Sequence, residues 1–292
     1  MKQDAFSRFH PVVNFLFFLG AIGFGVMIQH PAYLAAGILC SVVYFLLLRG
    51  GKALKLTLAL IPVFAVIALI NPLFNTYGKT VLFYLFGRPY TWEALCYGLV
   101  LGGMFVLMMV WFSCYNVVLT SDKFVCLFGS LIPSLSLLLV MILRLIPSFM
   151  RKTRQIIGAR NSIGKGGNEN ASFREKAASG MTVLSALADW ALEGSIVTAD
   201  SMRARGYGAA KRTSFRIYRM TGWDWAVLAL EGVLALIVLI TIFTGGTDAG
   251  YTYRISISPL TWGYGAYWAY LLIPTVIELK EEVQWRIIRS KI

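Results

Sequence analysis

The chain has 292 residues, of which 58% are hydrophobic and only 14% charged, and its mean hydropathy is +0.68. A soluble protein of this length uses about 25% charged residues to cover its cores, so the composition excludes an ordinary soluble protein. It also excludes a disordered chain, a collagen and a disulfide scaffold. The net charge of +13 is typical of a membrane protein that keeps its basic excess on the cytoplasmic side.

Four apolar stretches near the bilayer-crossing length open the chain. They cover residues 11–28, 32–48, 54–70 and 94–118. Arg49, Lys52 and Lys55 follow the second stretch on the same side as the N-terminus, and the positive-inside bias makes that side cytoplasmic. The first stretch leads straight into further spans without a small-residue cleavage site, so we expect no signal peptide.

Residues 124–150 and 181–198 also have the hydropathy of spans, but charge argues against that interpretation. If both crossed, residues 151–176 would lie outside with seven Lys or Arg and only two Glu, against the positive-inside bias. We therefore expect residues 124–220 to form a helical domain at the cytoplasmic face. Residues 144–219 carry 14 Lys or Arg and 5 Asp or Glu, a net +9.

Two further apolar stretches, residues 225–243 and 260–277, complete the predicted architecture. The prediction is an all-α polytopic membrane protein with about six transmembrane helices and both termini in the cytoplasm. Its expected divisions are four spans in residues 1–123, the cytoplasmic helical domain in residues 124–220, and two spans with a basic tail in residues 221–292.

The basic domain is predicted to contain two long helices, about residues 133–160 and 173–205. The first is apolar through Ile146 and then basic, and Pro147 is expected to kink it. The second is amphipathic and rich in small residues, including Gly194, so we expect another helix to cross it closely.

Both helices are predicted to end in a similar way, one in Ala159-Arg160-Asn161 and the other in Ala204-Arg205-Gly206. One interpretation is an ordinary helix stop, because the helix dipole favours a cation in the last turn and Gly or Asn suits the cap. The other is a pair of exposed guanidinium groups that bind carboxylates of a partner protein. The spacing leaves both open.

At these residues the sequence resembles the transmembrane T component of energy-coupling factor (ECF) transporters, the ABC-type importers of vitamins and metal ions in prokaryotes. The resemblance rests on Ala-Asp-Ser-Met-Arg-Ala-Arg-Gly-Tyr at 199–207 and on Leu-Arg-Leu-Ile-Pro at 143–147, which contains Arg144 and Pro147. The stretch Asn-Pro-Leu-Phe-Asn at 71–75 is also similar. One departure is Asn161, where the family's first signature has Gly or Ser after Ala-Arg.

The resemblance implies two long helices that cross as an X beneath the membrane. It implies that Arg160 inserts into one ABC ATPase subunit and Arg205 into another, identical or different, while the membrane portion holds a substrate-binding S component. The chain would be a plasma-membrane coupling subunit that is not itself an enzyme and binds no cofactor, since the partner subunits bind ATP. The transported substrate is not identified by this sequence.

Other classes of function are less well supported. A P-loop is absent from the sequence, as are H-E-x-x-H and G-x-S-x-G, and the four cysteines have no C-x-x-C spacing for a metal.

A self-contained ion-coupled transporter is the alternative from another class, with Glu231 in a late span as its candidate proton group. For Glu231, structural pairing or proximity to the interface is the favoured interpretation. A basic domain that binds anionic lipid or nucleic acid is a further alternative, but nucleic acid is disfavoured because aromatic residues do not interleave the basic block.

Overall fold

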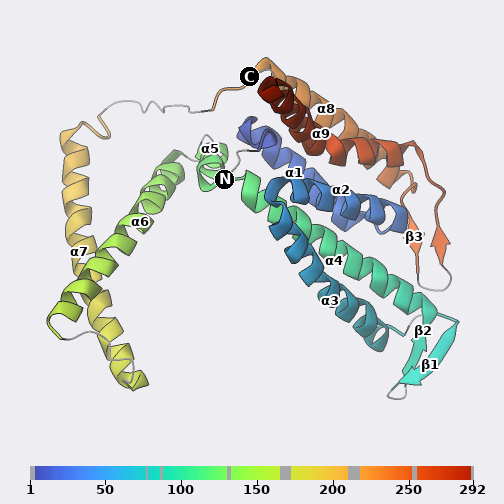
Figure 1. Cartoon of the computed structure of the whole chain (residues 1–292), viewed down its shortest axis with the longest axis horizontal. Helices are drawn as coiled ribbons and strands as arrows, with labels where there is room; N and C mark the ends of the chain where they lie inside the picture. Colours follow the sequence, from blue (N-terminus) through green and yellow to red (C-terminus); the bar gives the residue numbers. More distant parts are fainter. Residues whose placement is uncertain are drawn as a thin grey trace. The chain divides into compact units, whose positions relative to one another are not determined.

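A computed structural model describes residues 4–76, 78–85, 88–129, 133–164, 172–209, 218–251 and 255–290. The chain divides into two compact units, Met1–Phe124 with Tyr218–Ile292, and Val125–Ile217. Both are built almost entirely of helices (Figure 1), so the predicted all-α class is confirmed.

The first unit is a bundle whose helices lie side by side (Figure 1). Its helices are the 3-10 helix η1 (Phe6–Arg8), α1 (Pro11–Met27), α2 (Pro31–Arg49), α3 (Gly51–Phe74), α4 (Trp92–Val118), α8 (Gly222–Phe243) and α9 (Trp262–Ser290). The short helix α5 (Ser121–Gly129) contains the boundary between the two units.

Among the described residues, four helices are long and apolar enough to cross a membrane, namely α2, α3, α4 and α8. Helix α1 is equally apolar but has only 17 residues. Helix α9 has 29 residues and runs from the predicted last span into a charged C-terminal half. The chain is therefore compatible with a membrane protein, while the full count of six spans and their orientation stay predictions.

A His-Pro pair starts each of the first two helices. His10 and His30 are the N-caps of α1 and α2, and in each the ring Nδ1 accepts a hydrogen bond from the N–H two residues later, at 3.3 Å and 3.2 Å. Proline fits the first helical position because its missing N–H would have no partner there. The apolar stretches predicted at residues 11–28 and 32–48 are joined by a short turn, since α1 ends at Met27 and α2 begins at Pro31.

The core of the bundle is aromatic. Phe17 of α1 stacks on Tyr270 of α9, with ring centroids 5.2 Å apart, and meets Trp111 of α4 edge-on at 5.6 Å. All three side chains are buried. Tyr270 also donates a hydrogen bond to the backbone oxygen of Phe17 at 3.0 Å, so helices far apart in the sequence are joined around one cluster.

Helices α3 and α4 approach each other through glycine. A Cβ atom added at Gly98 would lie 2.6 Å from the backbone oxygen of Ala68, and one at Gly102 would lie 3.1 Å from that of Phe64. Gly98 and Gly102 form the G-x-x-x-G spacing that brings helix backbones together in membranes.

Two short antiparallel hairpins connect helices at the same end of the bundle (Figure 1). Strands β1 (Val81–Leu85) and β2 (Arg88–Thr91) lie between α3 and α4, and β3 (Ala249–Gly250) and β4 (Ser256–Ile257) lie between α8 and α9. Neither hairpin was predicted from the sequence, because each lies in a segment between two of the predicted spans.

The second unit consists mainly of two long helices, α6 (Pro133–Ser162) and α7 (Phe173–Ala204). The predicted ranges, 133–160 and 173–205, differ from them by no more than two residues. The capping box of Ser172 and Glu175 fixes the start of α7, since the Glu175 carboxylate accepts from the Ser172 N–H at 3.0 Å. Helix α6 continues through Pro147.

Candidate functional site

The candidate site lies on α6 and α7, which cross each other as an X (Figure 1). The ring of Phe149 on α6 meets the ring of Trp190 on α7 edge-on, with centroids 5.5 Å apart. Lys152 places its Nζ 5.7 Å from the centroid of the same indole, a cation–π contact. The half-buried residues of α7 recur at helical spacing, which defines one face toward α6. In the part of α7 that meets α6 they are Ser179, Val183, Leu187, Trp190 and Ala191, and Met202 near the helix end is also half-buried.

Arg160 lies inside the last turn of α6 and contacts α7. Its Nη2 donates a hydrogen bond of 3.1 Å to Oγ of Ser179, and the side chain is half-buried. Its neighbours Ala159 and Asn161 are exposed. This arginine therefore contributes to the pairing of the two helices as well as to the surface at this end of α6.

Arg205 occupies a different position, as the residue that caps α7. Gly206 follows with φ +79°, its N–H donates to the oxygen of Arg203 at 2.9 Å, and the N–H of Tyr207 donates to the oxygen of Met202 at 3.0 Å. This is a Schellman motif, in which glycine takes the left-handed conformation that ends a helix. Arg205, Ala204 and Gly206 are all exposed.

The two helix ends are thus less alike than the sequence suggests. Helix α6 continues two residues beyond Arg160 and turns at Gly164, which has φ +71° and whose N–H donates to the oxygen of Asn161 at 3.1 Å. Asn161 therefore stands where the other signature has glycine because the chain here still needs helical backbone. The difference between the two helix ends therefore has a local structural reason.

The remaining predicted residues have separate places. Arg144 and Pro147 are exposed on α6. Gly194 does not lie in the crossing, since a Cβ added to it would meet nothing within 4 Å. The expected contact of Gly194 with the first long helix is wrong, because the crossing uses the α7 face from Ser179 to Ala191. The small residues beyond it stay uncovered.

The surface of this unit is unusually apolar for one that carries so many cations. Several large side chains of α6 and α7 are 43% to 66% exposed in the described chain. They are Leu138, Val140, Ile142, Leu145, Ile146, Met150 and Ile157 on α6, and Met181, Leu184, Leu192, Ile196 and Val197 on α7. Helices with this much exposed apolar surface are expected to pack against a membrane or another protein.

Glu231 lies near the middle of α8 and is 3% exposed. Neither of its carboxyl oxygens has a hydrogen-bond partner in the described part of the chain. The favoured interpretation from the sequence included structural pairing, and the described residues supply no such partner. An acid inside an apolar helix is costly to bury and is by default a functional candidate.

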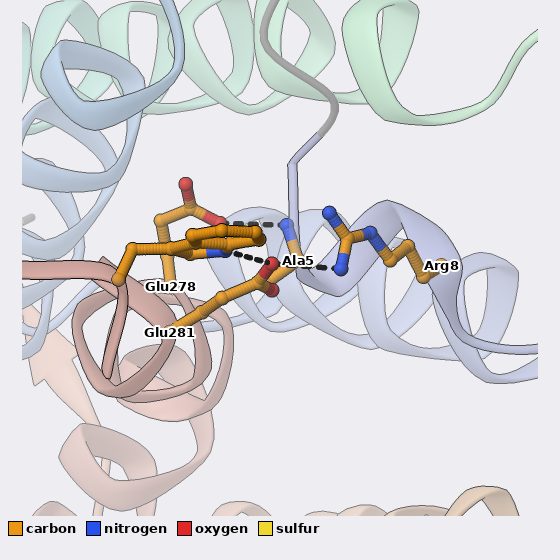
Figure 2. A network of polar contacts seen from close by, with 5 residues as sticks. Ala5, Arg8, Glu278 and Glu281 are labelled. Carbon is orange, nitrogen blue, oxygen red and sulfur yellow. Dashed lines mark hydrogen bonds and ion pairs between the residues drawn. The ribbon is translucent and has the colours of Figure 1, made fainter. Parts of the chain in front are cut away.

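A polar network that the sequence analysis missed joins the N-terminal segment to α9 (Figure 2). The N–H of Ala5 donates to Oε2 of Glu278 at 2.7 Å, and Nη1 of Arg8 pairs with Oε1 of Glu281 at 2.7 Å. Trp285 donates from Nε1 to the same Glu281 oxygen at 3.2 Å. The signal for it was present, since acids follow the last apolar stretch and a basic segment precedes the first.

Two ionisable groups of this network are buried. Asp4 is 6% exposed, and desolvation together with the neighbouring carboxyl of Glu278 raises its pKa to about 7. Lys123 of α5 is 4% exposed, and burial lowers its pKa to about 8. Its Nζ donates to Oγ of Ser7 at 2.8 Å and to the oxygen of Val118 at 3.0 Å. Through these hydrogen bonds and the ion pair, the residues before α1 contact both α5 and α9.

Comparison with known proteins adds no identification, since no family model and no curated protein matches the chain. Within the described residues there is no cluster of three His, Cys, Asp or Glu side chains that could hold a metal ion. The functional argument therefore depends on the chain's own residues.

Proposed function

We propose that this chain is the transmembrane coupling component of an ECF-type ABC importer. In this proposal two ABC ATPase subunits, identical or different, bind the ends of α6 and α7. Their ATP-driven motion passes through the crossed helices to a separate membrane S component that binds a vitamin or a metal ion. The chain itself performs no catalysis, and it lies in the plasma membrane of a prokaryote with both termini in the cytoplasm.

The observation that carries the proposal is the pair of crossed helices with an arginine at one end of each. Helices of 30 and 32 residues are about 45 to 48 Å long, long enough to act as levers between a membrane subunit and a soluble one. The contacts of Trp190 with Phe149 and Lys152 hold the two levers together. Motion applied to one helix end is then transmitted to the other helix.

The exposed surface agrees with a subunit of a larger assembly. Uncovered apolar side chains on both long helices suit helices of a membrane partner, and a net charge of +9 in residues 144–219 suits acidic docking surfaces of cytoplasmic partners. Arg205 stands exposed beside a fixed helix end, where a guanidinium can bind a carboxylate in bidentate geometry.

The test is purification of the tagged full-length chain from its native cells in mild detergent, followed by identification of the proteins that accompany it. We expect one or two kinds of ABC ATPase and at least one small polytopic membrane protein. The same purification is then repeated with a variant in which both Arg160 and Arg205 are changed to Glu. This variant should retain the membrane protein and lose the ATPases. A chain that purifies with no ATPase at all contradicts the proposal.

A second candidate function is a self-contained ion-coupled transporter, favoured by the buried and unpartnered carboxyl of Glu231. Here the decisive experiment is uptake into vesicles that contain this chain alone. Uptake driven by a proton gradient and abolished by Glu231→Gln would support this alternative. Uptake that requires ATP and added partner subunits, and that survives Glu231→Gln, would reject it.

A further inference from the structure

The β1–β2 hairpin has an apolar surface that nothing in the described chain covers. Four successive residues of β1 are exposed, with Val81 at 44%, Leu82 at 51%, Phe83 at 49% and Tyr84 at 72%. Because successive side chains of a strand point to opposite faces, the strand exposes apolar side chains on both of them. A hairpin in water would be expected to carry polar side chains on at least one face.

The base of the hairpin is held firmly, so its exposure is not that of a loose loop. The N–H of Trp92 donates to the oxygen of Thr80 at 3.0 Å, and Oγ1 of Thr80 donates to Glu93 at 2.6 Å. Tyr90 is buried and donates from its hydroxyl to the oxygen of Leu69 on α3 at 3.2 Å. The ring of Phe83 stacks on that of Tyr90, with centroids 4.6 Å apart.

The apolar surface continues from the hairpin onto the helix beside it. Phe74, the last residue of α3, is 75% exposed, and Leu69 and Ile70 one turn earlier are also exposed. Helix α3 is a candidate membrane span, and only 11% of its most apolar 18-residue segment is buried against the rest of the described chain. The hairpin therefore extends a helix surface of the kind that contacts lipid.

Exposed aromatic side chains lie at the helix ends next to the hairpin, and others lie at the opposite helix ends. Trp92 at the start of α4, Phe243 at the end of α8 and Trp262 at the start of α9 are exposed at this end. Trp223, Trp225 and Trp285 are exposed at the opposite end. The 22 residues of α8 separate the two groups by about 33 Å, close to the thickness of the hydrocarbon core. Aromatic belts of this kind lie at the two membrane interfaces.

We propose that the hairpin surface formed by Phe74, Val81, Leu82, Phe83, Tyr84 and Trp92 is seated in the interfacial layer of the lipid bilayer. It anchors the linked ends of α3 and α4 among the headgroups and the upper acyl chains. A groove on a protein would cover one face of the strand, whereas a lipid layer covers both. The inference requires a membrane but does not depend on the proposed coupling function.

The test places an environment-sensitive fluorophore at Leu82→Cys, in a chain whose four native cysteines have been replaced. The labelled full-length chain is inserted into phosphatidylcholine vesicles that carry a nitroxide either near the headgroup or deep in the acyl chain. Two matched labels serve as depth references. Ile61→Cys lies near the middle of α3, where Ile61 is 56% exposed, and Asp248→Cys lies in an exposed turn before β3.

We expect the label at position 82 to emit at shorter wavelength than the one at position 248 and to resist quenching by aqueous iodide. The shallow nitroxide should quench it more strongly than the deep one, and the order should reverse at position 61, which also verifies insertion. Iodide quenching at position 82 equal to that at position 248 would place the hairpin in water and overturn the proposal. Resistance to iodide and to both nitroxides would mean that protein covers the hairpin, which overturns it as well.

Discussion

The hydroxyl of Tyr44 donates a hydrogen bond of 2.6 Å to Oδ2 of Asp4, joining α2 to a segment that precedes the first helix. Both side chains are buried at the end of the bundle where α9 supplies Glu278. The carboxyl of Asp4 also interacts electrostatically with Lys123 of α5 and with the thiol of Cys114 of α4. A titratable carboxyl therefore stands where four helices and the N-terminal segment meet.

The stability of the bundle should have a minimum between about pH 7 and pH 8. Asp4 has a folded-state pKa raised from 3.8 to about 7, so its contribution is complete below pH 3.8 and is lost as pH rises through 7. Lys123 has a folded-state pKa lowered from 10.5 to about 8, so its contribution is present above pH 10.5 and is lost as pH falls through 8. Thermal unfolding of the detergent-purified chain from pH 5 to pH 10 measures both slopes.

Two variants separate these contributions. Asp4→Asn should flatten the acidic slope, and Lys123→Met should flatten the alkaline slope. Because the charge of Asp4 raises the pKa of Lys123, Asp4→Asn should also move the alkaline slope to lower pH without removing it. A wild-type stability curve that rises steadily from pH 5 to pH 8 would contradict the assignment to Asp4.

Substitution of Gly98 should destabilise the bundle far more than substitution of Gly232. A Cβ at Gly98 would press on the backbone of Ala68, whereas one at Gly232 on α8 would meet nothing within 4 Å. Overpacking a tight helix contact costs about 1 to 3 kcal/mol, so Gly98→Leu should lower the thermal midpoint and Gly232→Leu should not. The measurement is thermal unfolding of both variants in the same detergent, and equal midpoints would show that the α3–α4 contact is not close.

Much of the fold follows from hydropathy and charge, because spans and long amphipathic helices have clear periodic patterns. The starts of α6 and α7 lie at Pro133 and Phe173, the positions that the sequence predicts. The hairpins were missed because strands of five and four residues, such as β1 and β2, resemble any apolar loop. A buried hydrogen bond between residues far apart in the chain, such as that of Tyr44 with Asp4, leaves no local pattern in the sequence.

The candidate site was only partly predictable for a related reason. The arginine signatures are local motifs, and the positions of Arg160 and Arg205 at the two helix ends follow from them. Which face of α7 meets α6 depends instead on where Trp190 finds Phe149 and Lys152. The abundance of small residues pointed to Gly194, but aromatic packing determines the crossing.

The crossing should depend on Trp190 and tolerate a change at Gly194. Trp190→Ala removes the contacts with Phe149 and Lys152, and we expect it to weaken the α6–α7 pairing by about 1 to 3 kcal/mol, less than for a fully buried tryptophan. Gly194→Leu enters open space and should leave the pairing intact. Spin labels at the exposed positions 154 and 185 report the pairing, through a distance distribution that broadens only in the tryptophan variant.

The two arginines should differ in what their loss does. Arg160→Ala removes a hydrogen bond to Ser179 and should weaken the helix pairing as well as any partner contact, whereas Arg205→Ala removes only an exposed guanidinium beside the Schellman turn. Loss of one member of a buried charge pair with a partner costs about 2 to 5 kcal/mol, so either substitution should reduce ATPase copurification.

Charge reversal of either arginine should be worse than truncation. We expect Arg205→Glu to damage substrate uptake more than Arg160→Glu, because the guanidinium of Arg205 is exposed to a partner whereas that of Arg160 is half-buried against Ser179. The matched control is Arg203→Glu, an exposed cation two residues earlier at the same end of α7. Normal uptake in the double variant Arg160→Glu with Arg205→Glu, at normal membrane levels, would mean that both arginines serve only to end their helices.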